Sequence, residues 1–223
     1  MAVMPLRETK LTPPIRITGM KLYSSSRAPS PRRALIAARE KNIDLEVIEI
    51  DIAQAATKQP AFLAINPLGE LPVLVRDDGS VLTESIAICR WFEELVPTPS
   101  LFGQTPAERV RIQAALDQAS FRLYTPVTQV FLHGHPFNAT RRTQIPAIAE
   151  QCRTQVLAEM TRLNQILLQQ PYLATSAFSM ADIMAFSAID FARVVNLRID
   201  PQLSGLYDWY QRVKARPSTQ RAE

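Results

Sequence analysis

The stretch Asn66–Ser85, with the sequence NPLGELPVLVRDDGSVLTES, constrains the fold more than any other part of this chain. It contains two short strand-like runs, Leu71–Arg76 and Ser80–Leu82, separated by an Asp-Asp-Gly segment. An Asp-Gly pair between two apolar runs is a strong signal for a β-hairpin. Pro72 opens the first run, where a missing backbone N–H is tolerated, and Glu84-Ser85 opens a helical pattern after the second. The stretch therefore predicts a hairpin followed by a helix N-terminus, an arrangement that can seat a small anionic ligand.

The segments around this hairpin predict a small domain of mixed strands and helices. Extended or alternating apolar runs indicate strands, and apolar residues at helical spacing indicate helices. Ser30 followed by Pro31 predicts an N-cap and the first residue of a helix. In chain order we expect a strand at Ile17–Ser24, a helix from Ser30 to about Lys41, a strand at Leu45–Ile50, a short helix at Ala61–Ile65, the hairpin, and a helix at Ser85–Leu95.

The second half of the chain has no convincing strand pattern. A Pro-rich segment, Val96–Thr105, separates it from the first half and marks a domain boundary. Four helical patterns follow and predict an all-α bundle: Pro106–Leu132 with a bend near Pro126, Gln144–Gln169, Ser179–Val195 and Pro201–Arg216. The expected organisation is a loose N-terminal extension at 1–16, an α/β domain at 17–96, a linker at 97–105 and an all-helical domain at 106–223.

Composition and charge exclude several classes of function. A hydrophobic fraction of 47% and a charged fraction of 21% are those of a globular protein. The net charge of +4 is spread along the chain without a long basic run, which argues against nucleic-acid binding. No apolar run approaches the ~18 residues that span a membrane, and the N-terminus lacks the apolar core of a signal peptide, so we expect a cytoplasmic protein. Cys89 and Cys152 fall in apolar helical patterns and predict buried free thiols, and no metal-ligand spacing occurs, so we expect no metal.

Four motifs in order resemble those of the cytosolic glutathione transferases, a resemblance that covers about Met20 to the C-terminus. Asn66–Leu74 is similar to the family's N-P-x-G-x-V-P-x-L segment, and Leu82–Ser85 to its L-x-E-S motif. Ser179–Ile183 resembles the S-x-A-D box of the helical domain, and Ala215–Ser218 a common ending. Each motif is weak alone, but the order and spacing of all four indicate the family. The choice of residues along the chain resembles that of bacterial proteins, and the theta- and beta-like classes of the family have the most similar sequence patterns.

The resemblance implies a thioredoxin-like α/β N-terminal domain, an all-α C-terminal bundle, a homodimer and glutathione as co-substrate. It also implies a cis peptide bond at Pro72, with the backbone of Leu71 facing the cysteinyl part of glutathione. Glu84 and Ser85 then hold the γ-glutamyl end, since a carboxylate pairs with the ammonium group and a helix start binds the carboxylate. The alternatives are an ordinary strand-initiating proline and a plain helix cap at Glu84-Ser85. Ser179-x-x-Asp182 is a capping-box arrangement, which we interpret as structural.

The residue that activates the glutathione thiol is the most difficult site residue to identify from the sequence. The family places a Tyr, Ser or Cys in the loop after the first strand, but the serine position of theta-like classes falls on Ala28. The candidates are therefore Ser30, favoured because it lies at a helix start, then Ser26 and Ser25. The alternative for Ser30 is a plain N-cap. Arg33, like Arg27, either stabilises the thiolate by its charge or is a surface arginine.

The second substrate, a small-molecule electrophile, should bind between that loop and the first long helix of the bundle. Phe121 and Tyr124 are candidate walls, with bundle core as the alternative. The function that the resemblance implies is conjugation of the glutathione thiolate to this electrophile. Two alternatives stay open: glutathione-dependent peroxide or disulfide reduction, and a non-catalytic binding or regulatory protein on the same fold.

Overall fold

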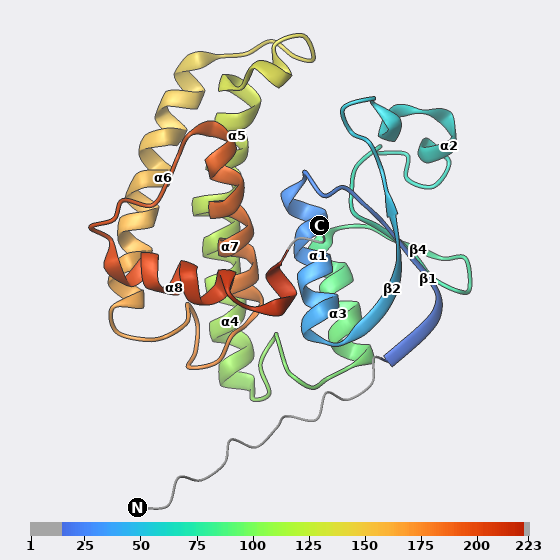
Figure 1. Cartoon of the computed structure of the whole chain (residues 1–223), viewed down its shortest axis with the longest axis horizontal. Helices are drawn as coiled ribbons and strands as arrows, with labels where there is room; N and C mark the ends of the chain where they lie inside the picture. The colour runs from blue at the N-terminus through green and yellow to red at the C-terminus, as the bar shows by residue number, and fades with distance from the viewer. Residues whose placement is uncertain (1–14, 221–223) are drawn as a thin grey trace, which may run out of the picture.

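The computed structural model describes residues 15–220, which form a small sheet domain joined to a helical domain (Figure 1). Most of the expected N-terminal extension, residues 1–14, lies outside the described residues. Ile15 and Arg16, which we expected to belong to that extension, are the first residues of a strand.

The first domain has the predicted order of strands and helices. Its elements are β1 (Ile15–Ser24), α1 (Pro29–Glu40), β2 (Ile43–Glu49), the 3₁₀ turn η1 (Ala56–Lys58), α2 (Pro60–Leu63), β3 (Val73–Val75), β4 (Val81–Leu82) and α3 (Ser85–Leu95). The strand order in the sheet is β2-β1-β3-β4. β1 and β2 are parallel because α1 crosses between them, while β3 is antiparallel to both of its neighbours. The hairpin is therefore confirmed, and the sheet contains both parallel and antiparallel pairs.

The second domain consists of helices and their connecting loops, with no strand among its described residues. Its elements are α4 (Pro106–Gln118), the π-helical segment η2 (Ala119–Tyr124), α5 (Thr125–Gly134), η3 (Pro136–Asn138), α6 (Pro146–Leu167), α7 (Met180–Ala192), η4 (Arg193–Val195), α8 (Ser204–Lys214) and η5 (Pro217–Thr219). The expected α/β domain followed by an all-α bundle is confirmed. In the described chain, no helix combines the length and the apolar character needed to cross a membrane.

Where we expected a bend near Pro126, the chain forms the π-helical segment η2, which lies directly before α5. Pro126 lacks an N–H, and its ring crowds the carbonyl four residues earlier, at Arg122. A wider turn with an extra residue removes that conflict while the chain stays helical.

The prediction of Ser30 as the N-cap of the first helix is wrong. Ala28 is the N-cap residue, with an extended backbone at φ −101° and ψ 138°, and Pro29 is the first helical residue. A proline at that position has its φ angle already set for a helix and lacks only an N–H that would be unpaired anyway. Ser30 therefore lies inside the first turn of α1, and its hydroxyl is free for other contacts.

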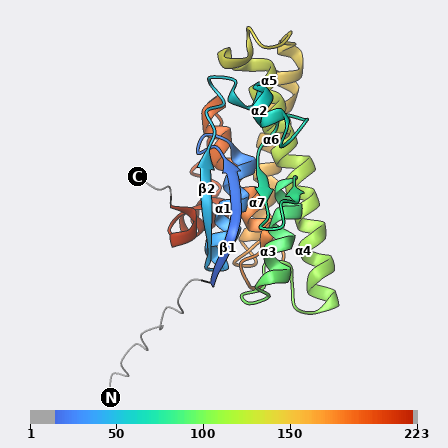
Figure 2. The same ribbon diagram turned by 90° about the vertical axis from the view of Figure 1, so that its right-hand side faces the viewer.

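Helices α1 and α3 form a layer between the sheet and the bundle, and α2 lies on the other side of the sheet (Figures 1 and 2). Leu22 and Leu74 from the sheet and Ile88 and Phe92 from α3 are completely buried in this layer. Cys89 and Cys152 are both buried and unpaired, as predicted.

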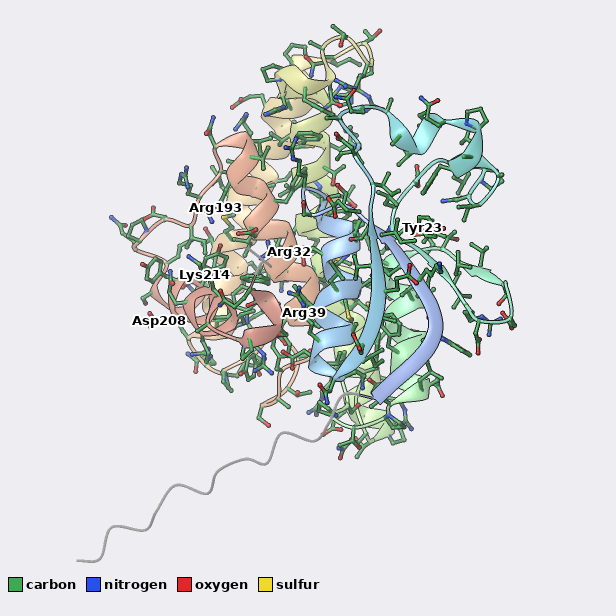
Figure 3. The ribbon with its side chains drawn as sticks, turned by 45° about the vertical axis from the view of Figure 1, so that its right-hand side comes forward. Tyr23, Arg32, Arg39, Arg193, Asp208 and Lys214 are labelled. Carbon is green, nitrogen blue, oxygen red and sulfur yellow. The ribbon has the colours of Figure 1, made fainter. Side chains whose placement is uncertain are left out.

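The two domains are joined along α1 and α7. Arg32 of α1 forms an ion pair with Asp190 of α7 and stacks over the ring of Phe186 at 5.1 Å, so it lies between these helices (Figure 3). At the other end of α1, Glu40 accepts two hydrogen bonds from Arg216 at 2.8 and 2.7 Å. These contacts fix the orientation of α1 against the bundle.

Asp182 organises the start of α7, which is the most buried helix of the bundle. One carboxylate oxygen accepts hydrogen bonds from the Leu173 N–H at 3.0 Å and the Trp209 indole at 2.9 Å. The other accepts from the N–H and hydroxyl of Ser179, the N-cap residue, both at 3.0 Å. Because this carboxylate joins α7, α8 and the preceding loop, the structural interpretation of Ser179 and Asp182 agrees with the fold. Burial outweighs these four donors and raises the pKa of Asp182 to about 6.

Asp182→Asn is expected to lower the free energy of unfolding, because an amide nitrogen then faces two of the four donors. The loss should depend on pH. The pKa is about 6 in the folded chain and ~3.9 for an unfolded aspartate. Proton binding therefore stabilises the folded wild type below about pH 4, and this contribution is lost as pH rises through 6. Urea denaturation should show that the difference in free energy of unfolding between wild type and variant narrows from pH 4 to 7.

Asp208→Asn is the matched control, since Asp208 lies exposed on α8 (Figure 3). Its free energy of unfolding should follow wild type across the same pH range. A gap for Asp182→Asn that stays constant or widens with pH would contradict a raised pKa at this carboxyl.

Candidate active site

A cavity of about 230 Å³ opens where α1, the hairpin, the start of α3 and the π-helical segment η2 meet. Its walls combine backbone, hydroxyl, carboxylate and guanidinium groups in a small volume. The lining residues are Ser30, Arg33, Asn66, Leu68, Glu70, Leu71, Pro72, Thr83, Glu84, Ser85 and Tyr124. Five of the predicted site residues (Ser30, Leu71, Pro72, Glu84 and Ser85) therefore lie around one cavity, together with one predicted pocket wall, Tyr124.

The segment before β3 supplies one wall. The Leu71–Pro72 peptide bond is cis, as the resemblance implied. Asn66 is buried and closes the turn before it, donating from its amide to the Glu70 carbonyl at 2.9 Å and accepting from the Leu68 N–H at 3.2 Å. Lys58 donates to the carbonyls of Leu68 and Gly69 at 3.0 and 3.1 Å. These contacts hold the backbone of Leu71 at the cavity.

Glu84 and Ser85 supply the opposite wall, at the N-terminus of α3. Glu84 has φ 65° and ψ 114°, a conformation that costs a non-glycine residue on the order of 1–3 kcal/mol. Its side chain makes no capping hydrogen bond to the helix, so the interpretation of Glu84 as a plain cap is not supported. The strained backbone instead places an exposed carboxylate beside the free N–H groups of a helix start.

Three side chains from distant parts of the sequence meet at the α1 end of the cavity. The Ser30 hydroxyl lies 2.8 Å from the Tyr124 hydroxyl and accepts a hydrogen bond from Arg33 at 2.6 Å. Arg33 also donates to the Ser85 hydroxyl at 3.2 Å, and its guanidinium lies 4.2 Å from the centre of the Tyr124 ring. The cluster links both ends of the cavity through one buried cation.

Ser25 and Ser26 are not brought to this cavity. Their hydroxyls lie 3.5 and 3.0 Å from a Glu49 carboxylate oxygen, on the other side of the loop. Both line a separate cavity of about 480 Å³ between α1, β2 and the C-terminal segment. The acidic end of β2 attracts these donors and turns them away from the start of α3.

Phe121 also lies elsewhere, as does Tyr23, the tyrosine next to the loop after β1. Phe121 is 72% exposed and lines a different cavity, beside α6. Its position in the first turn of the π-helical segment points it outward, whereas Tyr124 at the end of that segment reaches the site. Tyr23 belongs to β1 and packs edge-on against Phe62 of α2, with ring centres 6.1 Å apart (Figure 3).

The roles of two site residues, Arg33 and Tyr124, do not follow from the sequence alone. Arg33 was balanced between a thiolate-binding and a surface role, yet it is only 3% exposed. Its spacing of three residues from Ser30 in one helix is a signal that the two side chains share a face. Tyr124 was placed as a pocket wall, and no local pattern indicates that its hydroxyl meets Ser30 across 94 residues. Among residues 15–220, no group of His, Cys, Asp and Glu side chains could hold a metal ion.

Comparison with known proteins is consistent with this geometry. The family model described as "Glutathione S-transferase, N-terminal domain" matches residues 28–95, and "Glutathione S-transferase, C-terminal domain" matches residues 127–217. Glutathione S-transferase 2 of Saccharomyces cerevisiae is 33% identical over 206 residues, which cover 91% of this chain and 88% of that protein.

Solved structures give the same result. The crystal structure of Gtt2 from Saccharomyces cerevisiae superposes with a TM-score of 0.84 at 33% identity, covering 89% of this chain and 98% of that one. A glutathione S-transferase domain-containing protein of Marinobacter aquaeolei VT8 has a TM-score of 0.83 at 30% identity, covering 90% and 100% of the two chains. Sequence motifs, fold and relatives agree, and the chain belongs to the glutathione S-transferase family.

Proposed function

We propose that this protein binds glutathione in the 230 Å³ cavity and transfers its thiolate to an electrophilic small molecule. The main observation behind the proposal is that the two ends of the cavity carry different groups, each suited to a different part of glutathione. The Leu71 backbone, the Glu84 carboxylate and the start of α3 match the polar groups of a γ-glutamyl-cysteinyl peptide. The hydroxyl cluster at Ser30 lies at the other end, where a sulfur atom would need a donor.

Each end of glutathione finds a complementary group. The ammonium of the γ-glutamyl residue pairs with Glu84, and its carboxylate accepts from Ser85 and the N–H groups of the first turn of α3. The N–H and carbonyl of Leu71 hydrogen-bond the cysteinyl backbone as a short β-bridge. These contacts place the cysteinyl side chain toward Ser30 and Tyr124.

The Ser30–Tyr124 pair supplies one hydroxyl hydrogen to the ligand. Either hydroxyl can donate to the other across their 2.8 Å contact. The two hydroxyls have one hydrogen each, and one of these forms the hydrogen bond between them. The other hydrogen can therefore be donated to an acceptor in the cavity. A hydrogen bond to the sulfur stabilises the thiolate relative to the thiol, whose pKa in free cysteine is ~8.5. Tyr124 then has a second role as a wall for the electrophile.

The remaining features of the proposal are a homodimeric state and a cytoplasmic location. Val110 and Phe121 are 70% and 72% exposed on the α4–η2 segment, which is unusual for large apolar side chains and typical of an interface. Two buried, unpaired cysteines suit a reducing compartment.

We expect purified protein to bind immobilised glutathione and to conjugate a panel of aromatic and unsaturated electrophiles faster than it reduces peroxides. Ser30→Ala and Tyr124→Phe should each reduce kcat/KM by about tenfold or less, since the other hydroxyl can then donate. The double variant should lose on the order of 10²-fold. Steady-state kinetics with glutathione held near saturation measures this.

Ser26→Ala is the control and should retain wild-type conjugation, because Ser26 faces Glu49. A peroxidase rate far above the conjugation rate would favour the reductase alternative. A protein that neither binds nor turns over glutathione would overturn the proposed function.

Substitution of Glu84 should weaken glutathione binding, and the stability of the variant should depend on which residue replaces it. Glu84→Ala and Glu84→Gly both remove the carboxylate and should weaken glutathione binding by at least tenfold, as measured by calorimetry. Only glycine accepts φ 65° without strain, so the Gly variant should be more stable than the Ala variant by about 1 kcal/mol in urea denaturation. Equal glutathione affinity in wild type and both variants would rule out the proposed role of Glu84.

The dimer proposal predicts that sedimentation equilibrium gives about twice the 25.0 kDa chain mass. Phe121→Glu places a charge on the exposed apolar surface and should shift the protein toward monomer, whereas Leu157→Glu on α6 should not. A wild-type protein that stays monomeric at micromolar concentration contradicts this proposal.

A further inference from the structure

Arg33 is a buried cation that no carboxylate in the described chain neutralises. Its side chain donates to Ser30 and Ser85 hydroxyls and to the Met184 sulfur at 3.1 Å, all of which are neutral acceptors. The other strongly buried cation, Lys41, pairs with Glu93. Burying a charge without an opposite charge costs several kcal/mol, so the arrangement of Arg33 is incomplete as it stands.

The place where an anion would complete it is the candidate active site, because Arg33 lines that cavity. Tyr124 presents its ring to the guanidinium at 4.2 Å, a cation–π contact that stabilises the charge only in part. Glu70 and Glu84 line the same cavity, yet neither lies within 4.0 Å of Arg33. Cys89 of α3 donates to the Arg33 carbonyl, and burial raises the pKa of its thiol to about 12, so it stays neutral.

Arg33 also dictates what Ser30 can do. A guanidinium has donors only, so the Ser30 oxygen must accept from it at 2.6 Å. The Ser30 hydrogen is therefore directed away from Arg33, toward Tyr124 or the cavity. When Tyr124 donates to Ser30 as well, both lone pairs of the serine are occupied and its hydrogen points to the ligand.

We propose that Arg33 is the positioning residue that keeps the sulfur of bound glutathione ionised, by supplying the positive charge of the site and by orienting the Ser30 hydroxyl. This inference rests on the proposed function, since it takes glutathione as the ligand. On binding, the thiol releases its proton to solvent and the sulfur becomes the anion that Arg33 lacks. No other bond forms or breaks in this step.

The geometry favours the sulfur over the γ-glutamyl carboxylate as the anion served by Arg33. The 2.6 Å contact to Ser30 is charge-assisted and short, whereas the contact to Ser85 is longer at 3.2 Å. The carboxylate already has the start of α3, while the sulfur end has only the hydroxyl pair and this cation.

The test is the thiol pKa of glutathione bound to the protein, followed by the ultraviolet absorbance of the thiolate across a pH series. In wild type it should lie at least one unit below that of free glutathione. Arg33→Gln keeps a planar donor but removes the charge, and should raise the bound pKa by about one unit, a tenfold loss of thiolate near neutral pH. Arg33→Lys keeps the charge and should stay within about half a unit of wild type.

Arg27→Gln is the matched control. It removes the same charge from an exposed residue of the loop that precedes α1 and should leave the bound pKa unchanged. S-methylglutathione has no thiol to ionise. Its dissociation constants for wild type and the three variants should agree within about threefold, as measured by calorimetry. Circular dichroism establishes that each variant is folded.

The inference is overturned if the wild-type bound thiol titrates like free glutathione, a result that needs no variant. It also fails if folded Arg33→Gln keeps the wild-type pKa, or if Arg33→Lys rises to the free value. Should Arg33→Gln not fold, wild type and Arg33→Lys decide the question. Failure of the proposed function looks different: glutathione and S-methylglutathione do not bind, or an ionised thiol forms but no electrophile is conjugated.

Discussion

The site depends on how α1 is held between two layers. This helix packs against the sheet and α3 on one side and against α7 on the other (Figures 1 and 2). Arg32 bonds to Asp190 near its start, and Glu40 bonds to Arg216 at its end. Because both ends are anchored in the bundle, the first turn of α1 presents Ser30 and Arg33 to groups from the hairpin, α3 and η2. Loss of these anchors would separate the halves of the cavity.

The placement of charge along α1 follows from this position. Arg32 and Arg33 are adjacent in sequence, yet they point in directions about 100° apart around the helix. Arg32 reaches a carboxylate at the domain junction, while Arg33 reaches hydroxyls and a thioether at the cavity. One arginine is neutralised by the fold, and the other is left for a ligand. Adjacent residues of the same type thus have different electrostatic roles.

Much of the fold could be predicted because its signals are local. The Asp-Gly turn, the alternating strand residues and the Pro-rich linker each depend on a few neighbouring residues, and the helix Ser85–Leu95 has the predicted bounds. The start of α1 was misplaced by two residues because Pro29 and Pro31 are both plausible first helical residues, and the backbone of Ala28 selects Pro29. The π-helical form of the segment before Pro126 arises from crowding around a single carbonyl, which spacing alone does not reveal.

The candidate site was predictable where family motifs cover it, at Leu71, Pro72, Glu84 and Ser85. It was less predictable in the loop after β1, where four serines are close together in sequence. Only the end of β2 separates them, since Glu49 attracts Ser25 and Ser26 while Ser30 stays with Tyr124. A contact that spans 94 residues has no local pattern to announce it.

The π-helical segment η2 has a consequence for how this site can change over time. A π-helical turn holds one residue more than an α-helical turn, and it is equivalent to a one-residue insertion in an α-helix. Deleting one residue from Ala119–Tyr124 would restore α-helical spacing, leave the helices on both sides in their present register, and shift the residues inside the segment by one position. A neighbour would then replace Tyr124 beside Ser30, with the bundle otherwise intact. A single codon gained or lost in this segment is therefore enough to exchange the group that faces the sulfur without rebuilding the fold.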